Sequence, residues 1–452
     1  PLRLVGSEMC IRDRYIFVKI CIVSNNFINQ LRWRGLLQDV IPGCEEKLLE
    51  STASGYIGFD PTADSLHIGS LVQILILMHF QKSGHKPIVL IGGATGMIGD
   101  PSGKSSERNL LTKEELDKNI KGIKSQLSKF LNFDSKEKNS AVICNNNDWF
   151  DKINLIDFIR DIGKHLTVNY MVAKDSVKKR LSKDSKEGMS FTEFTYQIIQ
   201  AYDFYHLFKN ENCLVQMGGS DQWGNITSGT ELIRKKTGKK VFALTCPLIT
   251  KADGFKFGKT EEGNVWLDRN RTSPYKFYQY WLNISDEDAF KYIKIFTFYS
   301  EDEIIEFIKV HKKEPHLRSL QKIISSYLTE LVHSKEDLEK SIIASNILFG
   351  KSTSKDLGLL DENTFLDVFE GVPKANLSLS YLNSNPIIND FLFESGFFSS
   401  KSEINRAIKE NSISINKEKI SSDFKLSKLN LICDKYILVQ RGKKNYFLIV
   451  FN

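Results

Sequence analysis

The hydrophobic pattern between residues 56 and 91 predicts a strand, a helix and a second strand. Residues 56–59 and 88–91 are short, continuous apolar runs, and residues 66–83 between them are apolar through several helical turns. Two strands joined by a helix within about 35 residues form a βαβ unit, in which the strands are parallel. The pattern therefore predicts an α/β fold built on a parallel sheet.

The pattern changes character further along the chain. From Ser273 to about residue 348 it is that of helices rich in aromatic side chains. Residues 350–385 repeat Ser, Asn, Pro and Gly, which is typical of a loosely structured linker. Residues 386–452 combine an amphipathic helix at 401–409 with short strand-like runs. We therefore expect a helical part, a linker and a small mixed domain after the parallel sheet.

The first 24 residues have neither a helical nor a strand period. Their basic start is compatible with a transit peptide, but Glu8 and Asp13 argue against one, and an extension from a gene boundary fits as well. We treat residues 1–24 as a doubtful N-terminal extension. The apolar spacing of residues 25–50 predicts short amphipathic helices, with which the predicted fold begins.

Composition permits a polyanionic partner without requiring one. Of the 452 residues, 62 are Lys or Arg and 55 are Asp or Glu, which leaves a formal net charge of +7. Residues 386–452 contain 11 basic and 7 acidic residues, so this short segment carries +4 of that charge. The C-terminal segment is therefore the basic end of the chain, and an RNA partner is plausible.

The seven cysteines show no CxxC spacing, and a chain of this length does not need disulfides for stability. We expect reduced thiols, a cytoplasmic location and no metal site, structural zinc included. The longest early apolar run, residues 15–23, is interrupted by Lys19 and is too short to span a bilayer. No membrane partner is expected.

The turn between the first predicted strand and its helix is a candidate nucleotide site, because phosphates bind where a strand leads into a helix N-terminus. His67 can donate to a phosphoryl oxygen, and Gly69, which lacks a Cβ, lets a base or ribose lie against the backbone. An isolated HxG is more often an ordinary helix start. A P-loop is disfavoured, because Ile98 and Asp253 stand where GxxxxGK[ST] requires glycine.

Residues 191–204 predict a helix with a polar stripe. Tyr196, Gln200 and Asp203 lie at i, i+4 and i+7, so they share one face. A solvated face usually carries Lys and Glu, whereas buried Tyr, Gln and Asp need partners that a small polar ligand can supply. An ordinary wet helix face is the alternative.

Three further segments add candidate contacts. Gly219, Asp221 and Gln222 follow a predicted strand. Lys256 and Lys259 lie in a glycine-containing loop and can reach phosphates, although solvated surface loops have the same composition. Apolar positions at 155, 156, 158, 159 and 162 predict a helix with one sticky face, which suits a subunit interface as well as a core.

Together these motifs resemble the bacterial-type tyrosyl-tRNA synthetases, which are class I aminoacyl-tRNA synthetases. The resemblance rests on residues 56–69, 191–204, 218–227 and 256–260, and it continues in the family's order from about residue 26 to the end. His67-Ile-Gly-Ser70 corresponds to the HIGH signature of the family, and residues 256–260 correspond to its KMSKS loop. So many motifs in one order make the resemblance specific.

The resemblance implies a Rossmann-like parallel-sheet catalytic domain, an α-helical domain and a small α+β, S4-like RNA-binding domain, working as a homodimer. It implies that L-tyrosine and ATP form tyrosyl-adenylate and pyrophosphate, with Mg²⁺ accompanying ATP, and that tyrosine is then transferred to the 3′ end of tRNA(Tyr). The domains implied are 25–272, catalytic with a helical dimer-interface insertion; 273–349, helical and on the anticodon side; 350–385, the linker; and 386–452, S4-like.

The resemblance also implies roles for single residues. Tyr56 and Asp203 are expected to bind the substrate phenol. Asp100, Tyr196 and Gln200 are expected to hold the ammonium group of tyrosine. The contacts to the substrate or adenylate are expected from Asp60, Gly69, Gly219, Asp221 and Gln222, and the phosphate contacts from Thr62, His67, Lys256 and Lys259. Tyrosyl-tRNA synthetases are themselves a standard example of a site that rejects phenylalanine because its buried polar groups would stay unpaired.

One position departs from the family pattern. The fourth signature residue is Ser70, where the family often has His. Serine is shorter and uncharged, so a direct contact to the ribose is expected to be lost or bridged by water.

Three other functions compete with this prediction. Tryptophan activation uses the same fold, but Tyr56 with Asp203 suits a phenol better than an indole. A nucleotidyltransferase of the HxGH type rarely needs a separate basic tail. A non-enzymatic RNA-binding protein would need the tail but neither His67 nor Lys256.

Overall fold

The computed structural model describes residues 26–100, 102, 111–181, 188–252, 254, 257–260, 263–349, 353–384, 386–421, 423–442 and 445–452. The chain forms two compact units. The first contains the residues up to Asp64 together with Ser70–Ile249, and the second contains Ser65–Gly69 and Thr250–Asn452. The doubtful extension 1–24 lies outside the described residues, as does Lys256.

The first unit is built on a six-stranded sheet with the order β1-β6-β5-β2-β3-β4. Its strands are β1 (Asp39–Val40), β2 (Ser54–Phe59), β3 (Lys86–Ile91), β4 (Val142–Asn145), β5 (Cys213–Gly219) and β6 (Phe242–Cys246). Short β1 is antiparallel to β6, and the four other pairings are parallel. The predicted βαβ unit is confirmed, with Tyr56 of β2 opposite Ile88 of β3.

The strand order places a topological switch at β2. The chain moves from β2 outward to β3 and β4 on one side, and β5 and β6 lie on the other side of β2. The loops after β2 and β5 therefore leave the sheet in opposite directions. This strand order predicts a crevice at the carboxyl end of the sheet, which is where open α/β sheets bind ligands.

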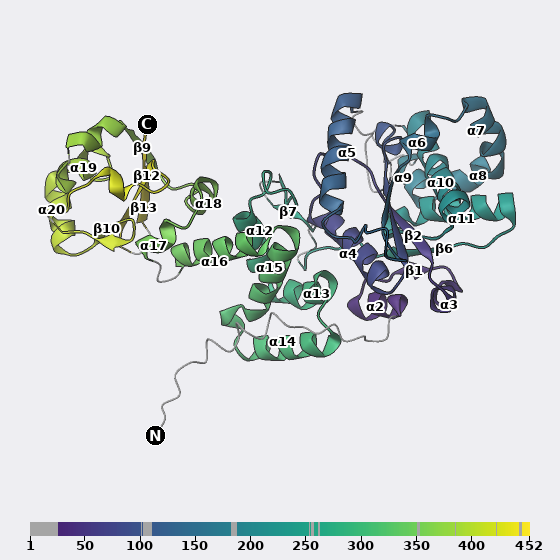
Figure 1. The fold of residues 1–452 in the computed structure, drawn as a ribbon, viewed down its shortest axis with the longest axis horizontal. Helices are drawn as coiled ribbons and strands as arrows, with labels where there is room; N and C mark the ends of the chain where they lie inside the picture. The colour runs from purple at the N-terminus through teal and green to yellow at the C-terminus, as the bar shows by residue number, and fades with distance from the viewer. Residues whose placement is uncertain are drawn as a thin grey trace, which may run out of the picture. The chain divides into compact units, whose positions relative to one another are not determined.

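Helices cover both faces of this sheet (Figure 1). One side carries α4 (Ile68–Lys82) and α5 (Lys113–Leu127), and the other carries α10 (Phe191–Glu211) and α11 (Trp223–Thr237). Because both faces are buried, the central strands are almost continuously apolar, as parallel strands usually are. Local signals begin these helices: Thr112 and Glu115 form a capping box for α5, and Ser190 caps α10.

The remaining helices of the first unit are short: α2 (Phe27–Arg34), α3 (Cys44–Glu50), α6 (Asn147–Phe150), α7 (Leu155–Asp161), α8 (Val168–Val172) and α9 (Asp175–Leu181). Helix α7 carries the predicted sticky face. Its Leu155, Ile156 and Ile159 side chains are 69%, 67% and 55% exposed. Three neighbouring apolar side chains in water form an unusual surface for an isolated subunit.

The helical part of the second unit follows the short strands β7 (Lys259–Thr260) and β8 (Gly263–Asn264). It consists of α12 (Pro274–Leu282), α13 (Asp286–Phe296), α14 (Glu301–Lys313), α15 (Ser319–Val332) and α16 (Lys335–Phe349). The aromatic residues that marked this region in the sequence form its core. Trp281 and Phe296 are fully buried, with ring centroids 5.0 Å apart. The α-helical domain expected from the sequence is therefore confirmed as part of the fold class.

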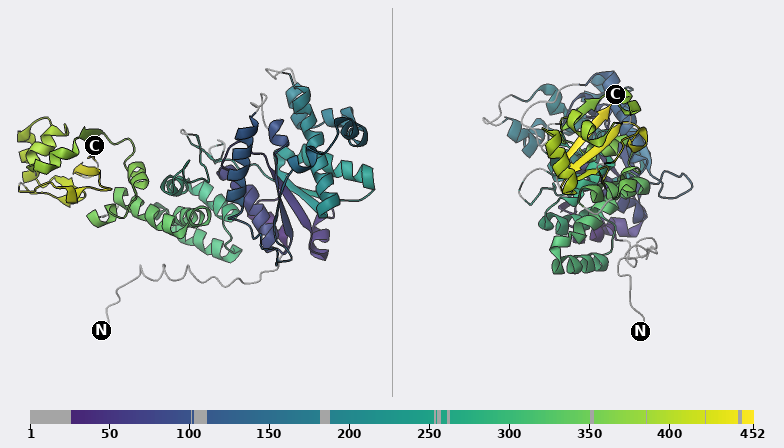
Figure 2. Two further views of the ribbon diagram at one scale, coloured as in Figure 1. Left: turned by 45° about the horizontal axis from the view of Figure 1, so that its top comes forward. Right: turned by 90° about the vertical axis from the view of Figure 1, so that its left-hand side faces the viewer.

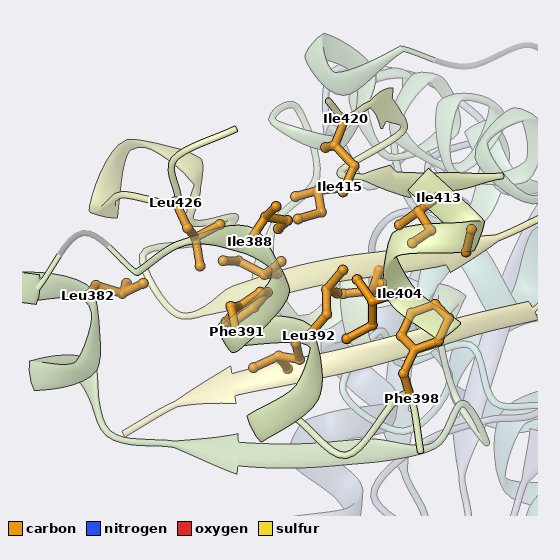
Figure 3. Packing of buried hydrophobic residues seen from close by; sticks show 14 of the residues in the cluster. Leu382, Ile388, Phe391, Leu392, Phe398, Ile404, Ile413, Ile415, Ile420 and Leu426 are labelled. Atoms are coloured by element: carbon orange, nitrogen blue, oxygen red, sulfur yellow. The ribbon is translucent and has the colours of Figure 1, made fainter. Parts of the chain in front are cut away.

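The C-terminal residues form a five-stranded sheet with the order β11-β10-β12-β13-β9, and its strands are yellow and green in Figure 2. The strands are β9 (Lys374–Leu377), β10 (Ile413–Ile415), β11 (Glu418–Lys419), β12 (Tyr436–Arg441) and β13 (Asn445–Phe451). Helices α19 (Ile388–Glu394) and α20 (Lys401–Lys409) pack on it through Phe391, Leu392 and Ile404 (Figure 3).

The predicted linker is corrected for its described residues. They contain α17 (Ser354–Leu357), α18 (Glu362–Val368) and strand β9, which pairs in parallel with β13. Phe365 and Phe369 are fully buried against the C-terminal sheet. The segment is mostly polar, so its few apolar residues received no weight in the prediction from sequence. These residues have the spacing that lets one short helix cover a sheet.

No described helix is both long and apolar enough to cross a bilayer.

We predict that Phe365→Ala lowers the free energy of unfolding of the second unit by about 3 kcal/mol, because it leaves a cavity under α18. The measurement is urea denaturation followed by circular dichroism. Phe393→Ala is the matched control, since Phe393 is 42% exposed in the same part of the chain. Equal effects of the two variants would contradict the burial of α18 on the sheet.

Candidate active site

A group of polar side chains gathers at the carboxyl end of the parallel sheet, in the crevice predicted by the strand order. Asp60 follows β2, Thr95 lies in the turn after β3, and Asn146 directly follows β4. Helix α10 adds Tyr196 and Asp203 from one face of the sheet. The strands bring these residues together although they are far apart in sequence.

Asp60 is held by two hydroxyl groups. The Tyr196 hydroxyl donates to Asp60 Oδ2 at 2.7 Å, and Thr95 Oγ1 donates to Asp60 Oδ1, also at 2.7 Å. Gly92 makes this approach possible, because a Cβ at that position would lie 2.0 Å from Asp60 Oδ1. The glycine-rich stretch after β3 thus serves close packing around a carboxylate.

Asn146 links Asp203 to Thr95, which in turn donates to Asp60. Its amide nitrogen donates to Thr95 Oγ1 and to Asp203 Oδ2, both at 3.1 Å, and its carbonyl oxygen accepts from the Ala94 amide at 2.7 Å. The indole of Trp149 donates to Asp203 Oδ1 at 2.9 Å. Both carboxylate oxygens of Asp203 are therefore occupied by donors that fix its orientation.

Thr95, Asn146 and Trp149 were not among the residues expected from the sequence. The sequence indicated no candidate among residues 145–149. Asn146 is in the site because it follows the parallel strand β4. This strand has only four residues, and no local sequence pattern reveals it.

Burial dominates the electrostatics around Asp203, which is 1% exposed. It raises the pKa of the carboxyl to about 8, although the Asn146 and Trp149 hydrogen bonds act in the opposite direction. Burial also raises the pKa of Tyr56 well above its ordinary value, and the Asp203 charge adds to this effect. The Tyr56 hydroxyl is buried and has no hydrogen-bond partner among the described residues.

Such a hydroxyl is costly to bury unless something binds it. The Tyr56 ring packs on Phe204 at 5.5 Å, so it cannot turn its hydroxyl to the solvent without losing that contact. The carbonyl oxygen of Gln200 is likewise buried and without a partner among the described residues. The polar stripe predicted on α10 therefore faces the interior rather than water.

Asp100 forms a second cluster with the residues after β5. Its carboxylate accepts from Gln222 Nε2 at 2.6 Å, from the Ser102 amide at 3.0 Å and from Asn225 Nδ2 at 3.4 Å. Burial, and then the Asp100 charge, raise the pKa of Asp221. A Cβ on Gly219 would lie 2.6 Å from Asp221 Oδ1, so a side chain at this position would displace the Asp221 carboxylate.

Asp60, Asp100 and Asp203 also act together on Tyr196. Burial and these three charges, with Asp60 first, raise the pKa of its hydroxyl well above the ordinary value. The crevice is therefore rich in carboxyl groups and contains no described lysine or arginine among these contacts. Such a site favours a ligand with a cationic group and hydrogen-bond donors.

His67, Ile68 and Gly69 of the signature belong to the second unit, whereas Ser70 belongs to the first. The backbone of Ile68 donates to Val265 at 2.9 Å, and that of Leu267 donates to Leu66 at 2.8 Å, so the segment around His67 is held like a short strand. The His67 ring lies 6.2 Å from that of Trp266. Its Nδ1 accepts from the Gly69 amide at 3.0 Å, which leaves the ring proton on Nε2 as a donor.

The other expected phosphate contacts are only partly described. Thr62 is exposed in the turn after β2, and its amide donates to the Asp60 carbonyl at 2.9 Å. Lys259 begins β7 (Lys259–Thr260), which pairs with β8 (Gly263–Asn264). Gly258 has a φ of +84°. A Cβ on this residue would lie 3.0 Å from the Ile68 side chain, so glycine leaves room for Ile68.

Comparison with known proteins gives two family matches. Residues 50–350 match the model described as tRNA synthetases class I (W and Y). Residues 364–449 match the model described as tyrosine–tRNA ligase SYY-like C-terminal domain. The first match covers the crevice and the signature segment, and the second begins inside the segment that we had predicted to be a linker.

Curated relatives agree with both matches. The chain is 61% identical to a tyrosine–tRNA ligase of Flavobacterium johnsoniae and 56% identical to one of Bacteroides thetaiotaomicron. Each alignment covers 94% of this chain and 99% of the relative. Among solved structures, a C-terminally truncated mitochondrial tyrosyl-tRNA synthetase of Aspergillus nidulans has a TM-score of 0.63 at 30% identity, covering 72% of this chain and 94% of its own.

These matches confirm the resemblance and the fold class expected from the motifs. They also separate the two amino acids that share the fold, because the relatives with more than half of their residues identical are ligases for tyrosine. The chain therefore belongs to the tyrosine–tRNA ligases, a family of class I tRNA synthetases.

Proposed function

We propose that this chain activates L-tyrosine with ATP and transfers it to tRNA(Tyr), using the crevice of the first unit as its tyrosine pocket. In the first step a tyrosine carboxylate oxygen bonds to the α-phosphorus, and the bond from that phosphorus to the oxygen bridging to the β-phosphate breaks. In the second step the adenylate gives its tyrosyl group to a hydroxyl at the tRNA 3′ end, and AMP leaves. Neither step requires a strong base, so positioning and charge stabilisation supply the rate.

The observation that carries the proposal is the buried hydroxyl of Tyr56 beside Asp203, which has no partner among the described residues. A substrate phenol has one donor and an acceptor. It can donate to a remaining lone pair of Asp203 and accept from Tyr56, so that the Tyr56 hydroxyl gains a partner. An indole offers only a donor, so tryptophan would leave the Tyr56 hydroxyl unsatisfied.

The rest of the amino acid is assigned to the carboxyl-rich part of the crevice. Asp100, Tyr196 and Gln200 are proposed to hold the ammonium group, whose positive charge suits these neighbours. Asp60, Gly69, Gly219, Asp221 and Gln222 are proposed to contact the substrate or the ribose of the adenylate. The glycines allow close approach, and the carboxylates accept from ribose hydroxyls.

Phosphate contacts are assigned to Thr62, His67, Lys256 and Lys259. His67 suits this role because its Nδ1 accepts from the Gly69 amide, so that a neutral ring carries its proton on Nε2. The described residues contain no group of three or more His, Cys, Asp or Glu that could hold a metal ion. We therefore propose that the phosphates hold the Mg²⁺ that accompanies ATP, because Mg²⁺ in nucleotide sites is bound largely through the phosphates.

The C-terminal sheet domain, with its excess of basic residues, is proposed to bind tRNA, and α7 is proposed to form a homodimer contact. The helices at 273–349 are proposed to lie on the anticodon side. A cytoplasmic location is supported by the described cysteines, which are all free thiols.

The test of the proposed reaction is tyrosine-dependent exchange of labelled pyrophosphate into ATP, with phenylalanine and tryptophan in parallel and no tRNA. We expect exchange with tyrosine alone. Exchange with tryptophan instead, or with no amino acid in a folded protein, would overturn the proposal.

Tyr56→Phe is predicted to lower kcat/KM for tyrosine in this assay by about tenfold, the loss of one neutral hydrogen bond. Phenylalanine, which has no phenol, should be affected much less, so the discrimination between the two amino acids should shrink. Tyr170→Phe is the control, because the Tyr170 hydroxyl donates to the Thr227 carbonyl away from the pocket. Unchanged discrimination in Tyr56→Phe would remove Tyr56 from the phenol site.

Stability should depend on pH through Asp203. Its pKa is about 8 in the folded chain, whereas an unfolded Asp titrates near pH 4. The folded state therefore binds an extra proton between these values. Its stabilising contribution is complete below about pH 4 and is lost as the pH rises through about 8.

We therefore expect the melting temperature of the natural chain to fall relative to that of Asp203→Asn between about pH 5.5 and pH 9. Differential scanning calorimetry over this range gives the comparison. The exposed Asp148→Asn variant should instead run parallel to the natural chain. Parallel curves for Asp203→Asn as well would show that Asp203 keeps an ordinary acidity.

Ile156→Asp is predicted to dissociate the homodimer, because it places a charge on the apolar face of α7. Sedimentation velocity at micromolar concentration should give half the mass of the natural protein. Leu429→Asp is the control, since Leu429 is 96% exposed in the C-terminal part. A monomeric natural chain, or a variant that stays dimeric, would exclude α7 as the contact.

A further inference from the structure

The C-terminal sheet is buried on both faces. Along β12, Ile437 and Val439 belong to the cluster under α19 and α20, whereas Tyr436 and Leu438 belong to a second cluster. Strand β13 alternates in the same way, with Ile449 in the first cluster and the residue before it in the second. This alternation is the two-residue period of a strand, so each cluster occupies one face.

The second face is covered by helices that precede strand β9 in the chain. The cluster includes Tyr275 of α12, Ala344 and Ile347 of α16, and Phe365 of α18. Phe365 also lies with its ring centroid 5.4 Å from that of Tyr436. Apolar contacts thus dock the sheet on the helical part, and these contacts determine how the sheet is oriented on the helices.

Lys417 stands out at the edge of the docked face. It and Asn416 form the two-residue turn between β10 and β11, with φ angles of +71° and +48°. Turns with two positive φ angles strongly favour Asn followed by Gly, because only glycine adopts such an angle without strain. Asn416 fits this rule, but lysine at the second position does not. A strained residue of this kind persists where its side chain makes compensating contacts.

The Lys417 side chain makes three such contacts, one across the docked face to α16 and two to Tyr446 of the same sheet. Its Nζ donates to the Ile347 carbonyl at 2.8 Å and to the Tyr446 hydroxyl at 2.7 Å, and it lies 4.6 Å from the centroid of the Tyr446 ring. Ile347 belongs to α16 and Tyr446 belongs to β13. The ammonium group therefore bridges the end of α16 and strand β13.

We propose that Lys417 is a positioning residue that fixes the C-terminal sheet on the end of α16 and so sets the orientation in which this domain presents bound tRNA. The docking follows from contacts within the second unit. The consequence for tRNA rests on the proposed RNA-binding role of the sheet domain.

The backbone angle gives the proposal a clear test. If Lys417 were only a turn residue, Lys417→Gly would relieve its strain and raise the melting temperature. If its side chain holds the sheet, Lys417→Gly and Lys417→Met should both loosen the docked face. Lys417→Arg, which keeps a charged donor, should retain most of the docking.

The experiment uses the full chain and two readouts. Hydrogen–deuterium exchange should become faster at the end of α16 and in the β10–β11 hairpin of Lys417→Met. Tyrosine-dependent pyrophosphate exchange, which needs no tRNA, should stay unchanged. The KM for tRNA in aminoacylation should rise by about tenfold, the lower end of what the loss of a hydrogen bond to a charged group produces.

Lys419→Met is the matched control. Lys419 lies two residues further on, loses the same charge on substitution, and donates to the Asn411 carbonyl within its own domain rather than to α16. An equal rise in KM for Lys419→Met would show that general attraction for RNA, not docking, is at work, and would overturn the proposal. So would a Lys417→Gly chain that melts higher with unchanged exchange, or a loosened face without a change in KM.

The two parts can fail separately. A natural chain that charges no tRNA would refute the proposed function, while hydrogen exchange in the Lys417 variants would still decide whether the side chain holds the sheet. Normal charging with unchanged hydrogen exchange in Lys417→Met would instead refute the positioning role alone.

Discussion

Burial of carboxyl groups at the carboxyl end of a parallel sheet is the constraint on which the first unit depends. An isolated buried carboxylate is strongly destabilising, so each one must be given donors. Asp203 receives them from Asn146 and Trp149, and Asp60 receives them from Tyr196 and Thr95. These donors come from the ends of different strands and from α10, and the sheet must hold all of them in register for the site to exist.

The same network explains why the pocket can select its ligand. The donors hold the carboxyl groups in place before any substrate arrives, so little reorganisation is needed on binding. The hydroxyl of Tyr56 is the group left without a described partner beside Asp203. A ligand that completes this hydrogen bond is favoured over one that only fills the space, which is how a polar pocket distinguishes similar aromatic side chains.

The second unit meets a different constraint, because a sheet with two apolar faces must be covered twice. Helices α19 and α20 cover one face within the domain, but α16 and α18 are needed for the other. A domain that borrows its cover in this way takes its orientation from the helices on which it docks. The short, polar-looking segment that contains α18 is therefore part of the packing rather than a flexible connection.

By itself, the sequence determined the βαβ unit, the helix with the polar stripe, the C-terminal helix at Lys401–Lys409 and, through ordered motifs, the family. These are local: periodicity, caps and short motifs act over a few residues. Only the tertiary structure decided that Thr95, Asn146 and Trp149 join Asp203, that α18 covers the C-terminal sheet, and that Lys417 reaches α16. Such contacts join positions 50 or more residues apart, and their partners are chosen by strand order and by the apolar surfaces that remain to be covered, which no local pattern contains.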